Sequence, residues 1–392
     1  MKSFSSILRA NFLTTGLAMF AMFFGSGNLI FPVAIGQMAG AQNIWAILGL
    51  FVTAVLLPFL TLVLMLFYDG DYHRFFKQVG FIPGKLIIFI ILALIGPFGG
   101  LPRCIAFSYS TFSIYTESMG IFWYSLVACI LVFFLSIRKS RVVGIIGNLL
   151  TPILLLSLSV IVVRGLMIEP SMMARTEAVS DLSMLKRGLL EGYKTFDIFA
   201  ALFLATAIMP AFHNVLGRKA LSHEKGFASL ALGASVVGAL TLFVVYAGLS
   251  FVAANLSEPL AQVKNDQFLG AIATMTMGDL AGLVANVTVS MACLTTAITL
   301  ALISAQFLSQ DVFLGKVSYF NSLILTMAIS FLVSLLGFNG IMAMVLPILT
   351  IICPAIITLV ITSSFKYLYG FRYGRELFYL VLAVSIVVTV FS

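Results

Sequence analysis

The sequence predicts an all-α polytopic membrane protein, and three observations carry this prediction. Of its 392 residues, 61% are apolar and only 9% are charged. The mean hydropathy is +1.14, whereas a soluble domain carries about 25% charged residues to keep its surface hydrated. The apolar residues lie in long uniform runs, whereas the strands of a membrane β-barrel alternate apolar and polar positions over about ten residues. A bundle of transmembrane helices is therefore expected.

Eleven apolar runs are candidates for these helices. About 20 helical residues are needed to cross roughly 30 Å of hydrocarbon. The expected spans cover residues 10–33, 43–67, 86–109, 119–137, 142–163, 195–213, 228–254, 279–309, 318–337, 340–362 and 377–391. No linker or low-complexity segment separates them, so residues 1–392 are predicted to form a single transmembrane domain.

The distribution of basic residues predicts the orientation, because Lys and Arg are retained on the cytoplasmic side. With the N-terminus inside, fifteen of the 22 basic residues face the cytoplasm, six face outside, and Arg103 falls within a span. Five of the six lie in one loop that is expected before the sixth span: Arg164, Arg175, Lys186, Arg187 and Lys194. A cytoplasmic N-terminus is therefore predicted. The basic residues form no block, so a nucleic-acid partner is not expected.

The sequence lacks motifs typical of enzymes and of metal sites. It contains no Gly-x-Ser-x-Gly elbow, no phosphate-binding loop and no His-Glu-x-x-His. The four cysteines lie in apolar runs without a Cys-x-x-Cys spacing and are interpreted as buried hydrophobic residues. Neither an enzyme nor a cofactor is predicted, and no obligate protein partner is evident.

The first span contains a polar interruption, Gly25-Ser26-Gly27-Asn28. Two glycines, a serine and an asparagine weaken a helix where lipid offers no replacement hydrogen bonds. A break here would point the N–H groups of Ser26, Gly27 and Asn28 at a carboxylate and the carbonyls near Phe23 and Phe24 at an ammonium or a bare cation. The alternative is close helix packing at small residues, but packing does not need an asparagine.

The eighth run contains Ala292-Cys293-Leu294-Thr295-Thr296-Ala297. The two hydroxyls could bind an ion only if backbone carbonyls, such as that of Ala292, complete the shell. From composition alone, hydrogen bonds from each threonine to its own helix are the stronger interpretation.

Charged residues near the spans receive less specific interpretations. Arg103 follows a run of two prolines and three glycines that should kink or open the third span, and it faces either a cavity, a partner or the nearby interface. Asp197 and Asp279 are interpreted as interfacial or helix N-terminal charges. No catalytic role is assigned to His213 or His223.

Several of these segments, in order, resemble the branched-chain amino acid:cation symporters of the BrnQ type. The resemblance lies in the first span from Gly16 to Pro32, Ile95-Gly96-Pro97 with Pro102-Arg103, Leu150-Thr151-Pro152-Ile153-Leu154, Gly192-Tyr193-Lys194-Thr195-Phe196-Asp197 and the Ala292–Ala297 segment. It covers about residues 10–360. It implies the leucine-transporter fold, with two inverted five-helix repeats and broken first and sixth helices. The repeats would cover residues 10–163 and 195–362, with an extra span at 377–391.

The resemblance also implies site residues. The first-span break around Gly25 would bind the carboxylate of a substrate through Ser26, Gly27 and Asn28, and the Phe23 carbonyl would bind its ammonium. The sixth span would break near Phe203 to Thr206, and Phe203 would line an apolar pocket. A sodium ion would be bound by the carbonyls of Ala21, Phe24 and Ala292 and the hydroxyls of Thr295 and Thr296.

Two departures from the family pattern affect these expectations. The family usually has glycine after the phenylalanine of the sixth span, where this chain has Leu204. Family members usually have twelve spans, whereas eleven are predicted here.

The function that the resemblance implies is sodium-coupled uptake of Leu, Ile and Val across a bacterial cytoplasmic membrane. Titratable groups are scarce in the spans, which favours sodium over a proton relay. The alternatives are a proton-coupled carrier, a carrier of another small zwitterion such as methionine, and an amino acid sensor that does not transport.

Overall fold

The computed structural model describes residues 4–116, 119–137, 151–171, 180–220 and 224–391, and this part of the chain is helical throughout, without strands. The first half contains α1 (Phe4–Phe23), α2 (Ser26–Ala39), α3 (Asn43–Phe51), α4 (Leu57–Phe67), α5 (Tyr72–Phe76), α6 (Phe81–Ile95), α7 (Gly100–Tyr115), α8 (Ile121–Ser136) and α10 (Thr151–Leu166). The second half contains α11 (Asp181–Tyr193), α12 (Asp197–Ala220), α13 (Glu224–Asn255), α14 (Phe268–Met277), α15 (Ala281–Phe307), α16 (Tyr319–Ser334), α17 (Gly337–Tyr369) and α18 (Gly374–Phe391).

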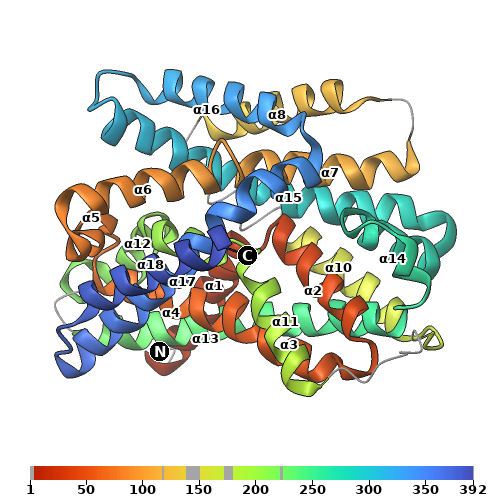
Figure 1. Ribbon diagram of the computed structural model, residues 1–392, viewed down its shortest axis with the longest axis horizontal. Helices are drawn as coiled ribbons and strands as arrows, with labels where there is room; N and C mark the ends of the chain where they lie inside the picture. Colours follow the sequence, from red (N-terminus) through yellow and green to blue (C-terminus); the bar gives the residue numbers. More distant parts are fainter. Residues whose placement is uncertain (1–3, 117–118, 138–150, 172–179, 221–223, 392) are drawn as a thin grey trace.

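The helices form two groups that meet at the centre of the molecule. In Figure 1, α7, α8, α15 and α16 lie together along one side, and α1, α4, α12 and α13 lie together on the other. The helix α2 packs on α13, and α11 packs on α3. Five helical stretches of the described residues are long and apolar enough to cross a membrane: Ser26–Phe67, Phe81–Tyr115, Ala228–Asn255, Ala281–Val312 and Gly337–Tyr369. Large apolar side chains remain exposed on the outer helices, as lipid contact requires.

Each of the eleven predicted spans coincides with helix in the described residues. The second span is α3 and α4 joined by a π-helical turn at Val52–Leu56. The start of the fifth span, residues 142–150, lies outside the described residues, as do the basic residues Lys2, Arg138, Lys139, Arg141 and Arg175 and also His223. The last span, α18, has 18 residues and begins before the predicted residue 377.

The first and third spans are interrupted where the sequence predicted. The helix α1 ends at Phe23 and α2 begins at Ser26, with Gly25 in an extended conformation between them. The third span stops at Ile95 and resumes at Gly100, so that Arg103 lies in the first turn of α7. Its N–H donates to the Gly99 carbonyl at 2.9 Å, which closes that turn.

The sixth span breaks earlier than predicted. The helix α12 runs without interruption from Asp197 through Phe203 and Thr206, so the predicted break at these two residues is wrong. Leu204 stands where the resemblance led us to expect a glycine, and Leu and Ala, which favour helix, surround it. The break lies instead between α11 and α12 at Lys194–Phe196, where Phe196 adopts a φ of 72°.

The helix α11 precedes this break, in the stretch that the sequence assigned to an external loop. It packs closely along α3 through glycines, because a methyl group on Gly188 would overlap the Ala46 carbonyl and one on Gly49 would overlap the Leu185 carbonyl. Of the basic residues assigned to an external loop, Lys186 and Arg187 lie on α11 and Lys194 follows its last turn.

This close packing gives a first prediction. Gly188→Ala should lower the free energy of unfolding by about 1–3 kcal/mol, because α3 and α11 must separate to admit the methyl group. The thermal midpoint of purified protein in detergent measures this. Gly120→Ala is the control, since nothing lies within 4 Å of a methyl group there. Equal midpoints for the two variants would contradict the packing.

Candidate functional site

The breaks of the first, third and sixth spans meet α15 around one small cavity. Its volume is about 30 Å³. Polar groups from all four spans face it, together with apolar residues. The lining residues are Met22, Phe23, Gly25, Ser26, Asn28, Ile95, Gly100, Arg103, Thr195, Phe196, Asp197, Ala200, Leu204, Thr296, Thr299 and Leu300. Of the first-span residues that the sequence singled out, Phe23, Gly25, Ser26 and Asn28 line this cavity, whereas Ala21, Phe24 and Gly27 do not.

Asn28 connects the two breaks. Its Oδ1 accepts a hydrogen bond from the Gly25 N–H at 2.8 Å, so this N–H does not continue α1 by bonding to the Ala21 carbonyl. Its Nδ2 donates to Asp197 Oδ2 at 2.7 Å and also to the Tyr246 hydroxyl. One amide therefore orients the end of α1, the start of α12 and the middle of α13.

Asp197 is a buried residue and not an interfacial one. It does begin α12, as the N-terminal interpretation requires, but it is only 4% exposed. Its Oδ2 also accepts from the Tyr246 hydroxyl at 3.2 Å. The sequence placed Asp197 in a family segment, but nothing in it showed that Asn28 and Tyr246 are its partners. The site therefore contains a titratable carboxylate that the sequence analysis missed.

Arg103 faces the cavity and contacts the sixth-span break. Of the three interpretations that the sequence left open, a cavity and a partner therefore hold, and the interface does not. Arg103 Nη1 donates to the Lys194 carbonyl at 2.8 Å and its Nη2 to the Thr195 carbonyl at 3.0 Å. The guanidinium carbon lies 3.9 Å from the centroid of the Phe196 ring. These carbonyls end the α11 half of the span, where a cation is favoured.

The predicted sodium ligands are brought together only in part. The Thr296 hydroxyl donates to the Phe24 carbonyl at 3.1 Å, which links α15 to the end of α1. A methyl group on Gly25 would overlap Thr296, so the contact is close. Thr295 donates to the Ala292 carbonyl of its own helix at 2.8 Å. Ala21 is buried in the last turn of α1.

The other two predicted substrate residues lie away from the cavity. Phe203 is fully buried, and its ring centroid lies 5.0 Å from that of Tyr72. Thr206 donates to the Phe203 carbonyl at 2.6 Å. Neither residue lines the cavity, although Leu204, which follows Phe203, does, so Phe203 lies on another side of α12. The residues at the real break are Lys194, Thr195 and Phe196.

Tyr72 and its neighbours form a polar cluster beside Phe203, on the segment between the second and third spans. The Tyr72 hydroxyl donates to Asp311 Oδ2 at 3.0 Å, and His73 Nε2 lies 2.6 Å from Asp311 Oδ1. Burial raises the pKa of Tyr72 and the Asp311 carboxylate raises it further, so that the hydroxyl remains protonated and can donate. The cluster joins the π-helical turn Leu308–Val312, which follows α15, to α12 through the Tyr72–Phe203 ring contact.

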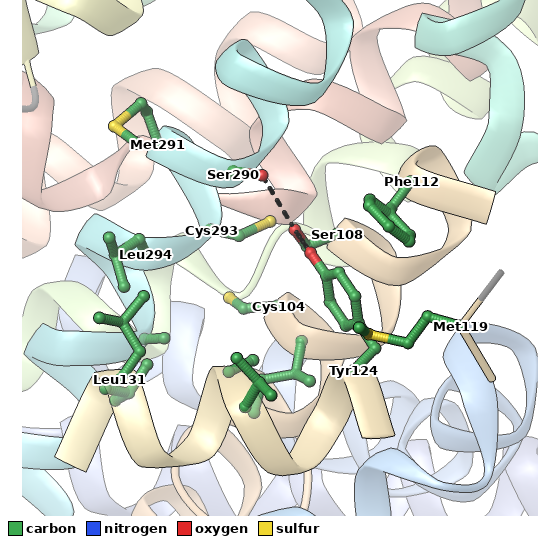
Figure 2. Close-up of a pocket in the computed structure, with 15 residues that line it drawn as sticks. Cys104, Ser108, Phe112, Met119, Tyr124, Leu131, Ser290, Met291, Cys293 and Leu294 are labelled. Carbon is green, nitrogen blue, oxygen red and sulfur yellow. Dashed lines mark hydrogen bonds between the residues drawn. The ribbon is translucent and has the colours of Figure 1, made fainter. Parts of the chain in front are cut away.

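A larger cavity of about 300 Å³ lies between α7, α8 and α15 (Figure 2). Its walls are mostly apolar, with Ser108 bonded to the Tyr124 hydroxyl at 2.6 Å and to Ser290 at 3.4 Å. Cys104 separates it from the small cavity, since its sulfur lies 3.5 Å from Ser26 Oγ.

Comparison with known proteins identifies the family. The profile of the family described as branched-chain amino acid transport protein matches residues 8–392. The chain belongs to this family. It is 28% identical over 371 residues to the branched-chain amino acid permease BraB of Bacillus subtilis. The aligned region covers 93% of this chain and 81% of that protein. This chain is also 28% identical to a putative branched-chain amino acid carrier protein of Staphylococcus haemolyticus, over 90% and 82% of the two chains.

Solved structures of distant transporters share the fold. MhsT in complex with L-phenylalanine matches with a TM-score of 0.60 at 14% identity, over 96% of this chain and 98% of that one. The Eremococcus coleocola manganese transporter, in complex with an aromatic bis-isothiourea compound, matches with a TM-score of 0.58 at 12% identity, over 100% and 87%. The leucine-transporter fold expected from the sequence is confirmed, and the family member is a multi-pass transport protein.

The Asn28 network gives a second prediction. Asn28→Ala should destabilise the protein by about 1–3 kcal/mol and impair transport, because the Gly25 N–H and Asp197 Oδ2 lose a buried partner. A double-mutant cycle compares the thermal midpoints of this variant, of Tyr246→Phe and of the double variant. The effects of the two substitutions on stability should be non-additive. Asn286→Ala is the matched control, since that amide donates to the Gly282 carbonyl of its own helix. Strictly additive effects would contradict a shared network.

Proposed function

We propose that this family member couples the inward movement of sodium to the uptake of leucine, isoleucine and valine across a bacterial cytoplasmic membrane, with its N-terminus inside. The observation that carries the proposal is the cavity at which the ends of two broken helices meet, with Thr296 of α15 bonded to the Phe24 carbonyl. Broken helices at such depth are typical of ion and substrate sites in transporters.

The two ends of the first-span break suit the two charges of an amino acid. The N–H groups that open α2 at Ser26, Gly27 and Asn28 carry the positive end of the helix dipole and favour a carboxylate. The carbonyl of Phe23 ends α1 and favours an ammonium. Gly25 admits the close approach of both, because it has no side chain.

Apolar residues of three other spans supply the wall for the substrate side chain: Ile95, Ala200, Leu204 and Leu300. One methylene in such a pocket changes binding by only about 1–3 kcal/mol, so leucine, isoleucine and valine should all be accepted. Selection among small zwitterions is therefore expected to be graded, and methionine belongs to the same series.

Sodium would bind between α1 and α15 through the carbonyls of Ala21, Phe24 and Ala292 and the hydroxyls of Thr295 and Thr296. Hydroxyl and carbonyl oxygens suit a hard cation without proton transfer. A unit charge crossing 100 mV contributes about 2.3 kcal/mol, to which the sodium gradient adds.

Asp197 favours one alternative, coupling to protons. It is the carboxylate among the residues that line the cavity, and it lies at a helix break. Ionisable groups inside a membrane span are typical of proton relays. A sensor that binds leucine without moving it is the second alternative.

Uptake of radiolabelled leucine into proteoliposomes tests these three possibilities. An inward sodium gradient should drive accumulation, and unlabelled isoleucine and valine should compete. Uptake that is unchanged without sodium would contradict sodium coupling. If a pH gradient alone drives uptake and Asp197→Asn abolishes it, the coupling ion is the proton. Binding of leucine without uptake or counterflow would indicate a sensor.

Thr296 provides the sharper test of the ion site. Thr296→Ala should raise the sodium concentration for half-maximal uptake about tenfold or more, because it removes one oxygen ligand, and Thr296→Ser should restore most of the affinity. Thr288→Ala is the control in the same helix, since that hydroxyl bonds to the Val284 carbonyl. If the alanine variants of Thr296 and Thr288 have the same sodium dependence, Thr296 is not a ligand.

A further inference from the structure

Arg103 carries unused hydrogen-bonding capacity at the centre of the bundle. Its side chain is 4% exposed, and its Nε has no hydrogen-bond partner. The ion pairs found among the described residues do not include it. A buried cation without a counter-ion is costly, and such residues inside membrane proteins are usually retained for function.

The sixth-span break is shaped around this guanidinium. Two carbonyls accept from its Nη atoms, and the Phe196 ring lies against its face. Phe196 reaches this position with a left-handed φ of 72°, which is unfavourable for a residue other than glycine. The cation–π contact offsets part of that cost. The contacts hold the guanidinium in one orientation and leave the Nε–H edge free.

Arg103 also lies against the start of α2. A Cβ atom on Gly27 would be 3.0 Å from Arg103 Nη2 and 2.9 Å from the Thr195 carbonyl. Ser26 and Asn28 line the same cavity as Arg103. The first N–H groups of a helix carry partial positive charge, so two sets of positive donors converge here. Among the described residues, Asp197 forms no ion pair with Arg103, and its Oδ2 accepts from Asn28 and Tyr246 instead.

We propose that Arg103 binds the α-carboxylate of the substrate and rests on the Lys194 and Thr195 carbonyls while the site is empty. This inference rests on the proposed function and assigns the carboxylate a side-chain partner in addition to the α2 backbone. A guanidinium presents two parallel N–H groups that match the two oxygens of a carboxylate. The cavity of about 30 Å³ has room for about two water molecules. Substrate binding therefore enlarges the cavity and draws the guanidinium from the carbonyls toward the carboxylate.

The test compares ligands with and without a carboxylate. In proteoliposomes, inhibition of radiolabelled leucine uptake is measured for leucine and for leucinamide, which retains the ammonium and the side chain. Arg103→Gln should raise the inhibition constant of leucine about tenfold or more, toward that of leucinamide, and leave the leucinamide value within twofold of the parent. Arg103→Lys keeps the charge without the two-pronged geometry and should give an intermediate leucine value.

Lys85→Gln is the matched control, because Lys85 is an exposed cation that lies over the Phe81 ring at the start of α6. Size-exclusion profiles and thermal midpoints establish which variants fold. If Arg103→Gln does not fold, the leucine constant of Arg103→Lys tests the proposal. An unchanged inhibition constant for leucine in the Arg103 variants would overturn the proposal. An equal rise of the constants for leucine and leucinamide would also overturn it, because that result is expected if Arg103 has a purely structural role. A parent protein that does not take up leucine would instead refute the proposed function.

Discussion

The absence of water from the bilayer core means that every backbone group released by a helix break must find a partner within the protein. This constraint organises the centre of the molecule. At the first-span break, the Gly25 N–H binds the Asn28 side chain and the Phe24 carbonyl accepts from Thr296. At the sixth-span break, the carbonyls of Lys194 and Thr195 accept from Arg103. Side chains thus replace the hydrogen bonds that a continuous helix would make, and those of Thr296 and Arg103 come from other spans.

The same contacts make the breaks suitable for exchange of partners. A carbonyl that accepts from a side chain remains satisfied if an ion or an ammonium takes the place of that donor. Under the proposed function, sodium at the Phe24 carbonyl requires only that the Thr296 hydroxyl turn a lone pair toward the ion. Binding then replaces one hydrogen bond by an ion–oxygen contact, and the helix ends keep a partner in both states. Such a site can be emptied and refilled without unfolding the breaks.

The parts of this arrangement that the sequence predicted are those with a local cause. The first-span break follows from Gly25-Ser26-Gly27-Asn28, and the interruption of the third span follows from its glycines and prolines. The sixth-span break has no comparable signal, since Lys194 and Thr195 are ordinary helix residues and a positive φ is not expected of Phe196 from its residue type. Asp197 and Asn28 are 169 positions apart, and Tyr246 lies in an apolar run. Their network depends on how the helices pack, which residue spacing does not encode.

Under the proposed function, the small volume of the central cavity bears on how transport of the amino acid stays coupled to the ion. A carrier wastes its ion gradient if the empty site conducts, so the empty site must exclude water and free ions. Here Arg103 covers the carbonyls at the end of α11, and the Asn28 amide occupies Asp197 Oδ2, so that acceptors attractive to a cation are already bonded. The positive guanidinium also repels a lone cation from the cavity, at an energy that the low dielectric of the interior increases. A substrate carboxylate would neutralise that charge, so the same arginine that excludes ions from the empty site would cease to do so when the amino acid binds.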